Sequence, residues 1–462
     1  MASTSHFSYH ATGIIIHPTE KHILLVGEQG HLTLPHVAWQ ATEYVHWADV
    51  TTVNQAMSHQ IGGELTTMRC LSDTYNRENR CFSRVYIMQL HTSAGMIAKS
   101  IRWIAARELF HTITVPTEQH SNIEQWLANL NTSSASPQPI PWYNPDWFAS
   151  VISWIEKQLE HRGSRVVAAP EQLRVGERGY LLRISTTTGI IYFKALPTFF
   201  AHELAILATL APGYPSSMPV LMAVDREQRW MLMQDFGGTL LSQSENIGEL
   251  EEALRRYAVL QVEQVEQNQR LHELGCPYLP PEALAEQLED MLEDTPSLMM
   301  NAFPGLAEKD VIRLHALVPH LRSMCLQLAD GPVPCSLEHG DFHTGNIALT
   351  ATGPLFFDWT DSCITHPFFS FYPFLLGLEA QWAGETSIRQ RLRDVYLQPW
   401  EDYAPREQLI AIFELAQKLA PLYLATLYAS LIIPKLEARW EMRHGIPYNL
   451  QTLLERMRDE IV

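Results

Sequence analysis

The sequence predicts an α+β protein in which a small α/β domain precedes a strand-rich lobe and then a helix-rich lobe. Three observations support this prediction. The chain has 462 residues, more than one hydrophobic core usually serves. A proline-rich stretch interrupts it at residues 131–141. After that stretch strand patterns come first and helical patterns follow, an order typical of segregated layers.

The interruption defines the domain organisation. Residues 131–141 read Asn-Thr-Ser-Ser-Ala-Ser-Pro-Gln-Pro-Ile-Pro, and three prolines among small polar residues exclude a helix or a central strand. We therefore predict a domain at 1–130, a linker at 131–142, a strand-rich lobe at 143–245 and a helical lobe at 246–462.

The first domain is rich in β-branched runs. These runs predict strands within 13–26 and at 85–90, and helical spacing predicts a short helix at 123–130. The small α+β domain so formed has a usual domain size.

The strand-rich lobe begins with an amphipathic helix. Asn144 is its expected N-terminal cap and Pro145 lies in its first turn. The remaining elements of this lobe are expected as strands at 172–175, 180–185, 190–195 and 230–234, and a helix at 198–210.

The helical lobe begins with a long helical pattern at 247–274, which Gly275 ends as a C-terminal cap. Its longest apolar stretch, 422–434, is too short to span a bilayer and predicts a buried helix. Helical patterns also occupy 281–293, 308–328 and most of 366–462.

Charge and cysteine usage exclude several classes of protein. The net charge is −18, whereas nucleic-acid binding requires clustered positive charge. An acidic surface favours a cationic small-molecule partner, although such charge also serves solubility alone. The six cysteines show neither C-x-x-C nor zinc spacing. The first residues resemble no signal peptide, so we expect a cytoplasmic protein without membrane contact. The oligomeric state is not indicated.

Two nearby segments contain polar residues whose types and spacing suit phosphoryl transfer. Residues 337–349 read Leu-Glu-His-Gly-Asp-Phe-His-Thr-Gly-Asn-Ile-Ala-Leu, and residues 355–359 read Leu-Phe-Phe-Asp-Trp. In phosphoryl transfer a carboxylate on a tight loop can orient a hydroxyl and accept its proton, and Asp341 fits this role. Asn346 and Asp358 offer the hard oxygen ligands that Mg²⁺ prefers.

The segment His339 to Asn346 resembles the catalytic loop of the aminoglycoside phosphotransferase and choline kinase families, and is similar to that of protein kinases. The segment 357–359 resembles the metal-binding segment of the same families. The resemblance covers roughly 143–440. It implies a two-lobed protein-kinase-like fold that moves the γ-phosphate of ATP or GTP to a small-molecule hydroxyl with Mg²⁺. A turn that these polar residues merely cap is the alternative.

The resemblance also assigns nucleotide-binding residues. Lys194 ends a strand and would contact the α- and β-phosphates, paired with Glu203 on the next helix. Gln234 and Phe236 lie where backbone groups would hydrogen-bond to the adenine. The alternative for Lys194 and Glu203 is an ordinary lysine at a strand end and a solvated glutamate on a helix. The alternative for Gln234 and Phe236 is an ordinary strand followed by a Gly-Gly turn.

Two segments depart from the family pattern. The expected phosphate-covering loop, 174–180, has only two glycines, with Arg and Glu between them. His366 precedes Pro367 where many family members have an acidic residue. Asp361 and His343 are the candidates for contact with the acceptor, and a simple turn is the alternative for Asp361.

The first domain resembles a Nudix hydrolase over residues 1–130. Its strand pattern at 23–35 matches that of the Nudix family. The helix expected to carry the Nudix box, at 53–62, contains no carboxylate. A Nudix site needs several glutamates to hold Mg²⁺, so this domain should not hydrolyse nucleotides. The leading hypothesis for the chain is therefore a small-molecule kinase. The second is a catalytically silent kinase-like module for nucleotide binding or regulation.

Overall fold

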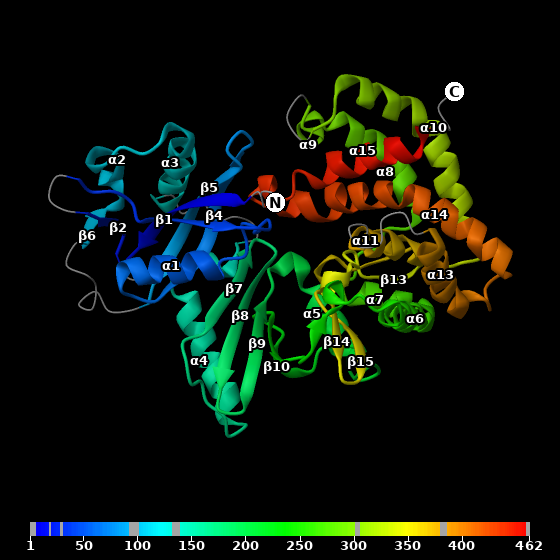
Figure 1. Cartoon of the computed structure of the whole chain (residues 1–462), viewed down its shortest axis with the longest axis horizontal. Coiled ribbons are helices and arrows are strands. Elements are labelled where there is room, and N and C mark those ends of the chain that lie inside the picture. The colour runs from blue at the N-terminus through cyan, green and yellow to red at the C-terminus, as the bar shows by residue number, and fades with distance from the viewer. Residues whose placement is uncertain are drawn as a thin grey trace, which may run out of the picture. The chain divides into compact units, whose positions relative to one another are not determined.

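The computed structural model describes residues 6–17, 20–27, 31–91, 101–131, 139–300, 305–378 and 386–458 (Figure 1). The chain forms two compact units. Unit 1 comprises Met1–Thr198 and Met222–Asp235, and unit 2 comprises Phe199–Leu221 and Phe236–Val462. Most of the linker expected at 131–142 lies outside the described residues. The domain boundaries given above remain a prediction.

Unit 1 contains a six-stranded sheet with the order β4-β5-β1-β2-β6, and β3 pairs with β1 as a branch. Its elements are β1 (Phe7–Ile16), β2 (His22–Val26), β3 (His36–Ala41), β4 (Leu65–Asn76), β5 (Cys81–Leu90), β6 (Ile101–Ala105), α1 (Thr51–Ile61), α2 (Leu109–Thr112) and α3 (Thr117–Asn131). β1 runs parallel to β5 and antiparallel to β2 and β3.

The core of this sheet is aliphatic, because alternate strand residues point to one buried face. Ile14, Leu25 and Val85 are fully buried there, and Ile123 of α3 covers them. The helix expected at 123–130 is therefore correct in place but longer. The Nudix-like identity of the domain stays a prediction. The expected box helix is α1, which carries no carboxylate in its first turn and ends at Gly62 with a left-handed φ of 76°.

A second, antiparallel sheet in unit 1 has the order β10-β11-β9-β8-β7. Its elements are β7 (Glu171–Gly176), β8 (Gly179–Thr186), β9 (Gly189–Ala195), β10 (Leu221–Asp225), β11 (Trp230–Gln234) and α4 (Trp147–Glu160). Trp147 and Trp154 of α4 pack on Trp230, with ring centroids 6.2 and 5.6 Å apart. The prediction that Asn144 caps the start of this helix is confirmed, because its side-chain oxygen accepts from the N–H of Asp146 at 3.1 Å. The regular helix begins at Trp147, after Asp146.

Unit 2 is mostly helical. Its elements are α5 (His202–Leu210), α6 (Ile247–Gln264), α7 (Asn268–Glu273), α8 (Pro281–Glu293), α9 (Thr295–Leu298), α10 (Glu308–Ala329), α11 (Phe371–Leu376), α13 (Thr386–Leu397), α14 (Arg406–Thr426), α15 (Gly445–Arg456) and the strands β12 (Thr239–Leu240), β13 (Ser336–Glu338), β14 (Ile347–Thr350), β15 (Gly353–Phe356) and β16 (Cys363–Thr365). The helix expected at 247–274 is divided, since a 3₁₀ turn at Val265–Gln267 separates α6 from α7.

Two small sheets in unit 2 hold the loops that contain the candidate site residues. β12, β14 and β15 form one, and β13 pairs with β16 to form the other. Between β13 and β14 runs the segment expected to be catalytic, and β15 leads directly to Asp358. Both segments therefore start from short strands whose hydrogen bonds hold them in register.

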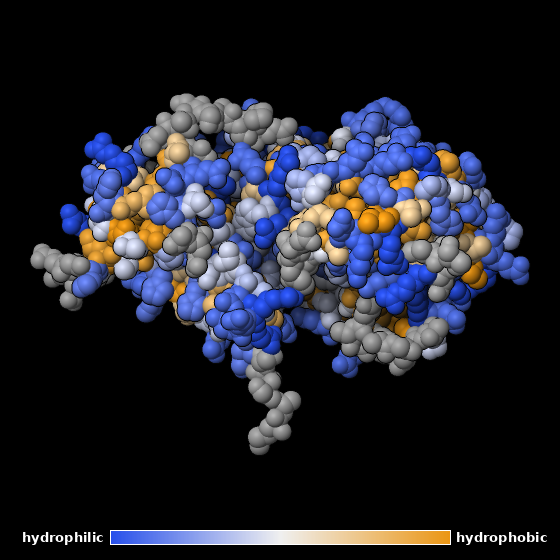
Figure 2. Space-filling view, turned by 90° about the horizontal axis from the view of Figure 1, so that it is seen from above, coloured by the Kyte–Doolittle hydropathy of each residue, from blue (hydrophilic) through white to orange (hydrophobic). Residues whose placement is uncertain are grey.

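The apolar stretch expected at 422–434 belongs to a longer helical run. Arg406–Lys435 is long and apolar enough to cross a membrane by length and composition alone, but 72% of its apolar window is buried inside the structure. A core helix of a globular protein has the same property. On the face drawn in Figure 2, hydrophilic residues predominate and apolar residues form separate groups.

Candidate active site

The loop between β13 and β14 brings Asp341 and Asn346 together. The side-chain amide of Asn346 donates to the backbone oxygen of Asp341 at 2.9 Å and to its carboxylate Oδ2 at 3.2 Å. Asn346 is buried, whereas the Asp341 side chain is 41% exposed. The amide thus holds a carboxylate that a reactant can still reach, which a general base requires.

Asp358 lies beside this loop through backbone contacts. The N–H of Phe357 donates to the carbonyl oxygen of Asn346 at 3.2 Å, and His339 Nε2 lies 2.9 Å from the carbonyl oxygen of Phe357. Asp358 itself has a φ of 64°, which is uncommon for a residue with a Cβ. Strain of this kind persists only where surrounding contacts enforce it, and it is frequent at functional sites.

Glu203 reaches the same segment from α5. It is 1% exposed, and its Oε2 lies 2.7 Å from the Thr360 hydroxyl, which is 2.8 Å from Asp358 Oδ1. One hydroxyl thus stands between two carboxylates. Since it has a single proton, it can donate to only one of them at a time. Sequence reasoning paired Glu203 with Lys194, and Thr360 was not expected in the site.

His343 lies against the expected base. Its Nδ1 accepts from the N–H of Gly345 at 3.0 Å, so the neutral ring carries its proton on Nε2. That nitrogen is 3.6 Å from Asp341 Oδ2. The geometry therefore relates His343 to the orientation of Asp341. Its expected contact with the acceptor stays a prediction.

Asp361 is 5% exposed, in contrast to Asp341. Burial lowers the pKa of Lys435, and the negative charge of Asp361 acts in the opposite direction and raises it. This electrostatic relationship places Lys435 near Asp361. The acceptor-binding role of Asp361 remains a prediction.

The other nucleotide-binding candidates divide between the units. In unit 1, Lys194 lies in β9 opposite Met231 and Gln234 ends β11 opposite Ile191. In unit 2, the ring of Phe236 lies 5.3 Å from that of Phe357. The expected Lys194–Glu203 pair and the adenine contacts of Gln234 and Phe236 stay predictions.

Sequence reasoning missed a buried carboxylate under the loop. Glu338, fully buried at the end of β13, accepts from the Gly340 N–H at 2.5 Å, from the Tyr423 hydroxyl at 2.5 Å and from the Ser370 hydroxyl at 2.7 Å. The available signal was a glutamate at the end of the strand Ser336–Glu338, directly before the loop. Its partners could not be identified, because Tyr423 is 85 residues away.

Burial dominates the protonation states around this carboxylate. It raises the pKa of Glu338 to about 7, against the three hydrogen bonds, which favour the charged form. It lowers the pKa of His339 to about 4 and that of His366 to about 3, so both rings are neutral near pH 7. A neutral His339 donates through Nε2 to the carbonyl oxygen of Phe357 and adds no positive charge next to Asp358.

The donor atoms fit a magnesium ion. The nitrogen of the Asn346 amide is committed to Asp341, which leaves Oδ1 as the ligand atom. Asp358 adds a carboxylate. Among the described residues no group of three or more His, Cys, Asp or Glu could hold a metal. Two protein oxygens suit Mg²⁺, which takes its remaining ligands from phosphates and water.

Comparison with known proteins places these residues in a family. Residues 168–409 match the sequence profile of APH, described as the phosphotransferase enzyme family, and this segment includes every candidate residue named above. The match bears out the predicted resemblance to aminoglycoside phosphotransferases. No curated protein matches the chain.

Several solved structures are similar. A choline kinase from Cryptosporidium parvum Iowa II is 12% identical, with a TM-score of 0.48, over 68% of this chain and 96% of that chain. An ethanolamine kinase from Plasmodium vivax is 11% identical, with a TM-score of 0.46, over 74% and 95%. An aminoglycoside phosphotransferase from Streptomyces rimosus, in complex with ADP and streptomycin, is 16% identical, with a TM-score of 0.33, over 59% and 98%.

Proposed function

The chain belongs to the phosphotransferase enzyme family, and we propose that it transfers the γ-phosphate of ATP, or of GTP, to a hydroxyl group of a small molecule. One observation carries the proposal. The Asn346 amide holds the exposed carboxylate of Asp341, while the backbone of Asn346 pairs with Phe357 beside Asp358. Three groups required for phosphoryl transfer thus belong to one connected loop system.

Each residue has a role in this proposal. Asp341 orients the acceptor hydroxyl and accepts its proton, and Asn346 Oδ1 and Asp358 would hold Mg²⁺. When bound, the ion neutralises charge on the β- and γ-phosphates. Lys194 would contact the α- and β-phosphates, and the backbone near Gln234 and Phe236 would read the base.

The acidity of the chain supports a cationic acceptor. A net charge of −18 raises the local concentration of cations by long-range attraction. Asp361 and His343 are the proposed acceptor contacts. The identity of the acceptor follows from neither the fold nor the family.

The test is a turnover assay on the full chain with ATP, Mg²⁺ and a panel of aminoalcohols, aminoglycosides and sugars. ADP release should depend on the acceptor. Asp341→Asn should lower kcat about 1,000-fold, within the range of general-base catalysis, and retain nucleotide binding. Asp402→Asn, at an exposed position, is the matched control.

Two results count against the proposal. Absence of ADP release together with absence of a Mg·ATP-dependent rise in melting temperature would exclude a nucleotide site. Nucleotide binding without turnover on any acceptor would favour a silent nucleotide-binding module. The non-glycine residues Glu177 and Arg178 in the expected phosphate loop are the observation that favours this second candidate.

A further inference from the structure

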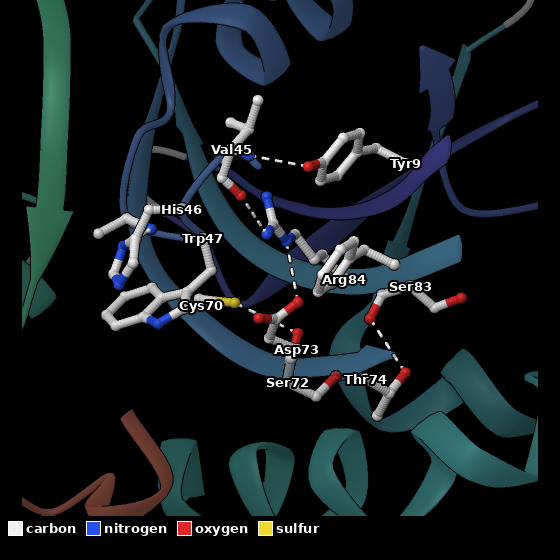
Figure 3. Close-up of polar contacts among 12 residues, drawn as sticks. Tyr9, Val45, His46, Trp47, Cys70, Ser72, Asp73, Thr74, Ser83 and Arg84 are labelled. Carbon is white, nitrogen blue, oxygen red and sulfur yellow. Dashed lines mark hydrogen bonds and ion pairs between the residues drawn. The ribbon is translucent and has the colours of Figure 1, made fainter. Parts of the chain in front are cut away.

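The N-terminal domain holds a short segment, Val45–Val50, by buried hydrogen bonds. Arg84, 1% exposed, donates from Nη2 to the carbonyl oxygen of Val45 at 2.6 Å, and Asp73 fixes its Nε at 2.9 Å (Figure 3). The Tyr9 hydroxyl accepts from the Val45 N–H at 2.8 Å (Figure 3). The segment is thus held from the sheet of its own domain, and we call it the strap.

The strap continues onto the second sheet of unit 1. The N–H of Val50 donates to the carbonyl oxygen of Leu173 at 3.1 Å, and the N–H of Val175 donates to that of Ala48 at 3.0 Å. These bonds flank an isolated antiparallel bridge between Asp49 and Arg174 of β7. Because β7 is otherwise an edge strand with unpaired backbone groups, the strap covers the edge that leads to the β7–β8 turn.

A buried polar network strengthens this junction. Gln172 of β7 is 3% exposed; its Oε1 accepts from Asn54 Nδ2 and the Thr67 N–H, both at 2.7 Å. Its Nε2 donates to the carbonyl oxygen of Thr67 at 2.7 Å. Separation of the domain from β7 would leave these buried groups without partners or expose them, at a cost of about 1–3 kcal/mol for each unsatisfied group. The N-terminal domain and β7 therefore form one structural body.

The same body holds the tip of the β7–β8 turn. Glu177, between Gly176 and Gly179, is 0% exposed, although turn tips are normally solvated. Its Oε1 accepts from the Tyr143 hydroxyl at 3.3 Å, and the Arg69 guanidinium of β4 lies 4.5 Å from the Tyr143 ring centroid. A buried carboxylate requires such partners, so the turn is attached to its support by its own side chain.

The positive charges of Arg178 in the turn and Arg174 in β7 lie near His46 of the strap. Burial, together with the positive charges of Arg174, Arg84 and Arg178, lowers the pKa of His46 to about 3. His46 is therefore a neutral ring near pH 7 that adds no fourth positive charge to this group of arginines.

We propose that the N-terminal domain is a positioning module for the triphosphate, which acts through Arg69 on Tyr143 and, through Tyr143, on Glu177 of the β7–β8 turn. The inference rests on the proposed function, since the family resemblance makes this turn the phosphate-covering loop. A glycine-rich loop adapts to phosphates by its backbone freedom. Here the turn is instead held by Tyr143, on which Arg69 of the N-terminal domain packs, and this support explains why bulky residues are accepted between its two glycines.

The test measures nucleotide affinity without an acceptor. Isothermal titration calorimetry on the full chain compares Mg·ATP with adenosine for the wild type, Glu177→Gln and Tyr143→Phe. Both variants should weaken Mg·ATP about tenfold, the effect of losing a hydrogen bond to a charged group, and leave adenosine unchanged. Glu227→Gln, exposed after β10 of the same sheet, should change neither affinity.

The outcomes separate this inference from the proposed function. A wild type that binds Mg·ATP, with variants that bind it equally well, would overturn the inference alone. Equal losses for Mg·ATP and adenosine would also overturn it, since they would show a merely structural contact. A wild type that binds no nucleotide would overturn the proposed function and the inference with it. Hydrogen exchange at residues 174–180 should accelerate in both variants if they release the turn, and unchanged exchange would contradict the attachment.

Discussion

Gly340 lies so close to Asp361 that a Cβ added to the glycine would meet the backbone oxygen of Asp361 at 2.0 Å. The loop between β13 and β14 and the segment after Asp358 are therefore in backbone contact, with no room for a side chain between them. The φ of Gly340, 80°, is also left-handed. Both features require glycine at this position.

Gly340→Ala should lower the free energy of unfolding by about 2–4 kcal/mol, the combined effect of left-handed strain and overpacking. Gly163→Ala is the matched control, because its φ is 66° and no atom lies within 4 Å of the added Cβ. It should cost about 1 kcal/mol from strain alone. Urea unfolding measures both. Equal losses would contradict the close approach to Asp361.

Asn346→Ala removes the amide that holds Asp341 and one oxygen expected on Mg²⁺. We expect kcat to fall about 100-fold, as for other misplacements of a catalytic group, and the Mg²⁺ concentration for half-maximal rate to rise. Initial rates across a magnesium titration measure both quantities. Asn76→Ala, in an exposed hairpin, should change neither. A lower kcat with an unchanged magnesium requirement would limit Asn346 to supporting the loop.

Thr360→Val removes the hydroxyl between Glu203 and Asp358 while conserving side-chain shape. Without it the two carboxylates lose their shared donor, and Asp358 loses its orientation. We expect kcat to fall about tenfold, the effect of one hydrogen bond to a charged group. Thr360→Ser, which retains the hydroxyl, should restore most of the rate. If Ser and Val variants were equally impaired, the methyl group and not the hydroxyl would matter.

Glu338 makes stability depend on pH. Burial raises its pKa from 4.5 to about 7 in the folded chain, so the folded state keeps a proton that the unfolded chain releases between these values. The stability from this proton is fully present below pH 4.5 and is lost as pH rises through 7.

The free energy of unfolding of the wild type should therefore fall by about 2–3 kcal/mol more, between pH 5 and pH 7.5, than that of Glu338→Gln. Urea unfolding at several pH values measures the two slopes. The glutamine variant is its own control for all other titrating groups. Parallel slopes would mean that Glu338 does not change its charge in this range.

The sequence predicted that the candidate site residues lie together, because they belong to one short stretch. Asp341 and Asn346 are five residues apart on a loop closed by its own hydrogen bonds, and Asp358 follows after one hairpin. Strands of the second sheet were also predictable. The turn at 186–189 joins β8 and β9, which were expected as strands at 180–185 and 190–195.

Element boundaries were less predictable, since they depend on local competition. The stretch 13–26 divides into β1 and β2, which pair antiparallel at Ile16 and Ile23. The regular helix begins at Trp147, after the turn that Asn144 caps. Neither outcome changes the side chains offered to the site.

By itself the sequence determined the residue types, their order and the local spacing that a phosphoryl-transfer loop needs. Only the tertiary structure decided which distant groups support them: Tyr423 under Glu338, Thr360 against Glu203, and the N-terminal domain on β7. The physical reason is that a buried polar group must find a partner wherever the chain is packed against it. That partner is selected by the fold and leaves no periodic trace in the sequence.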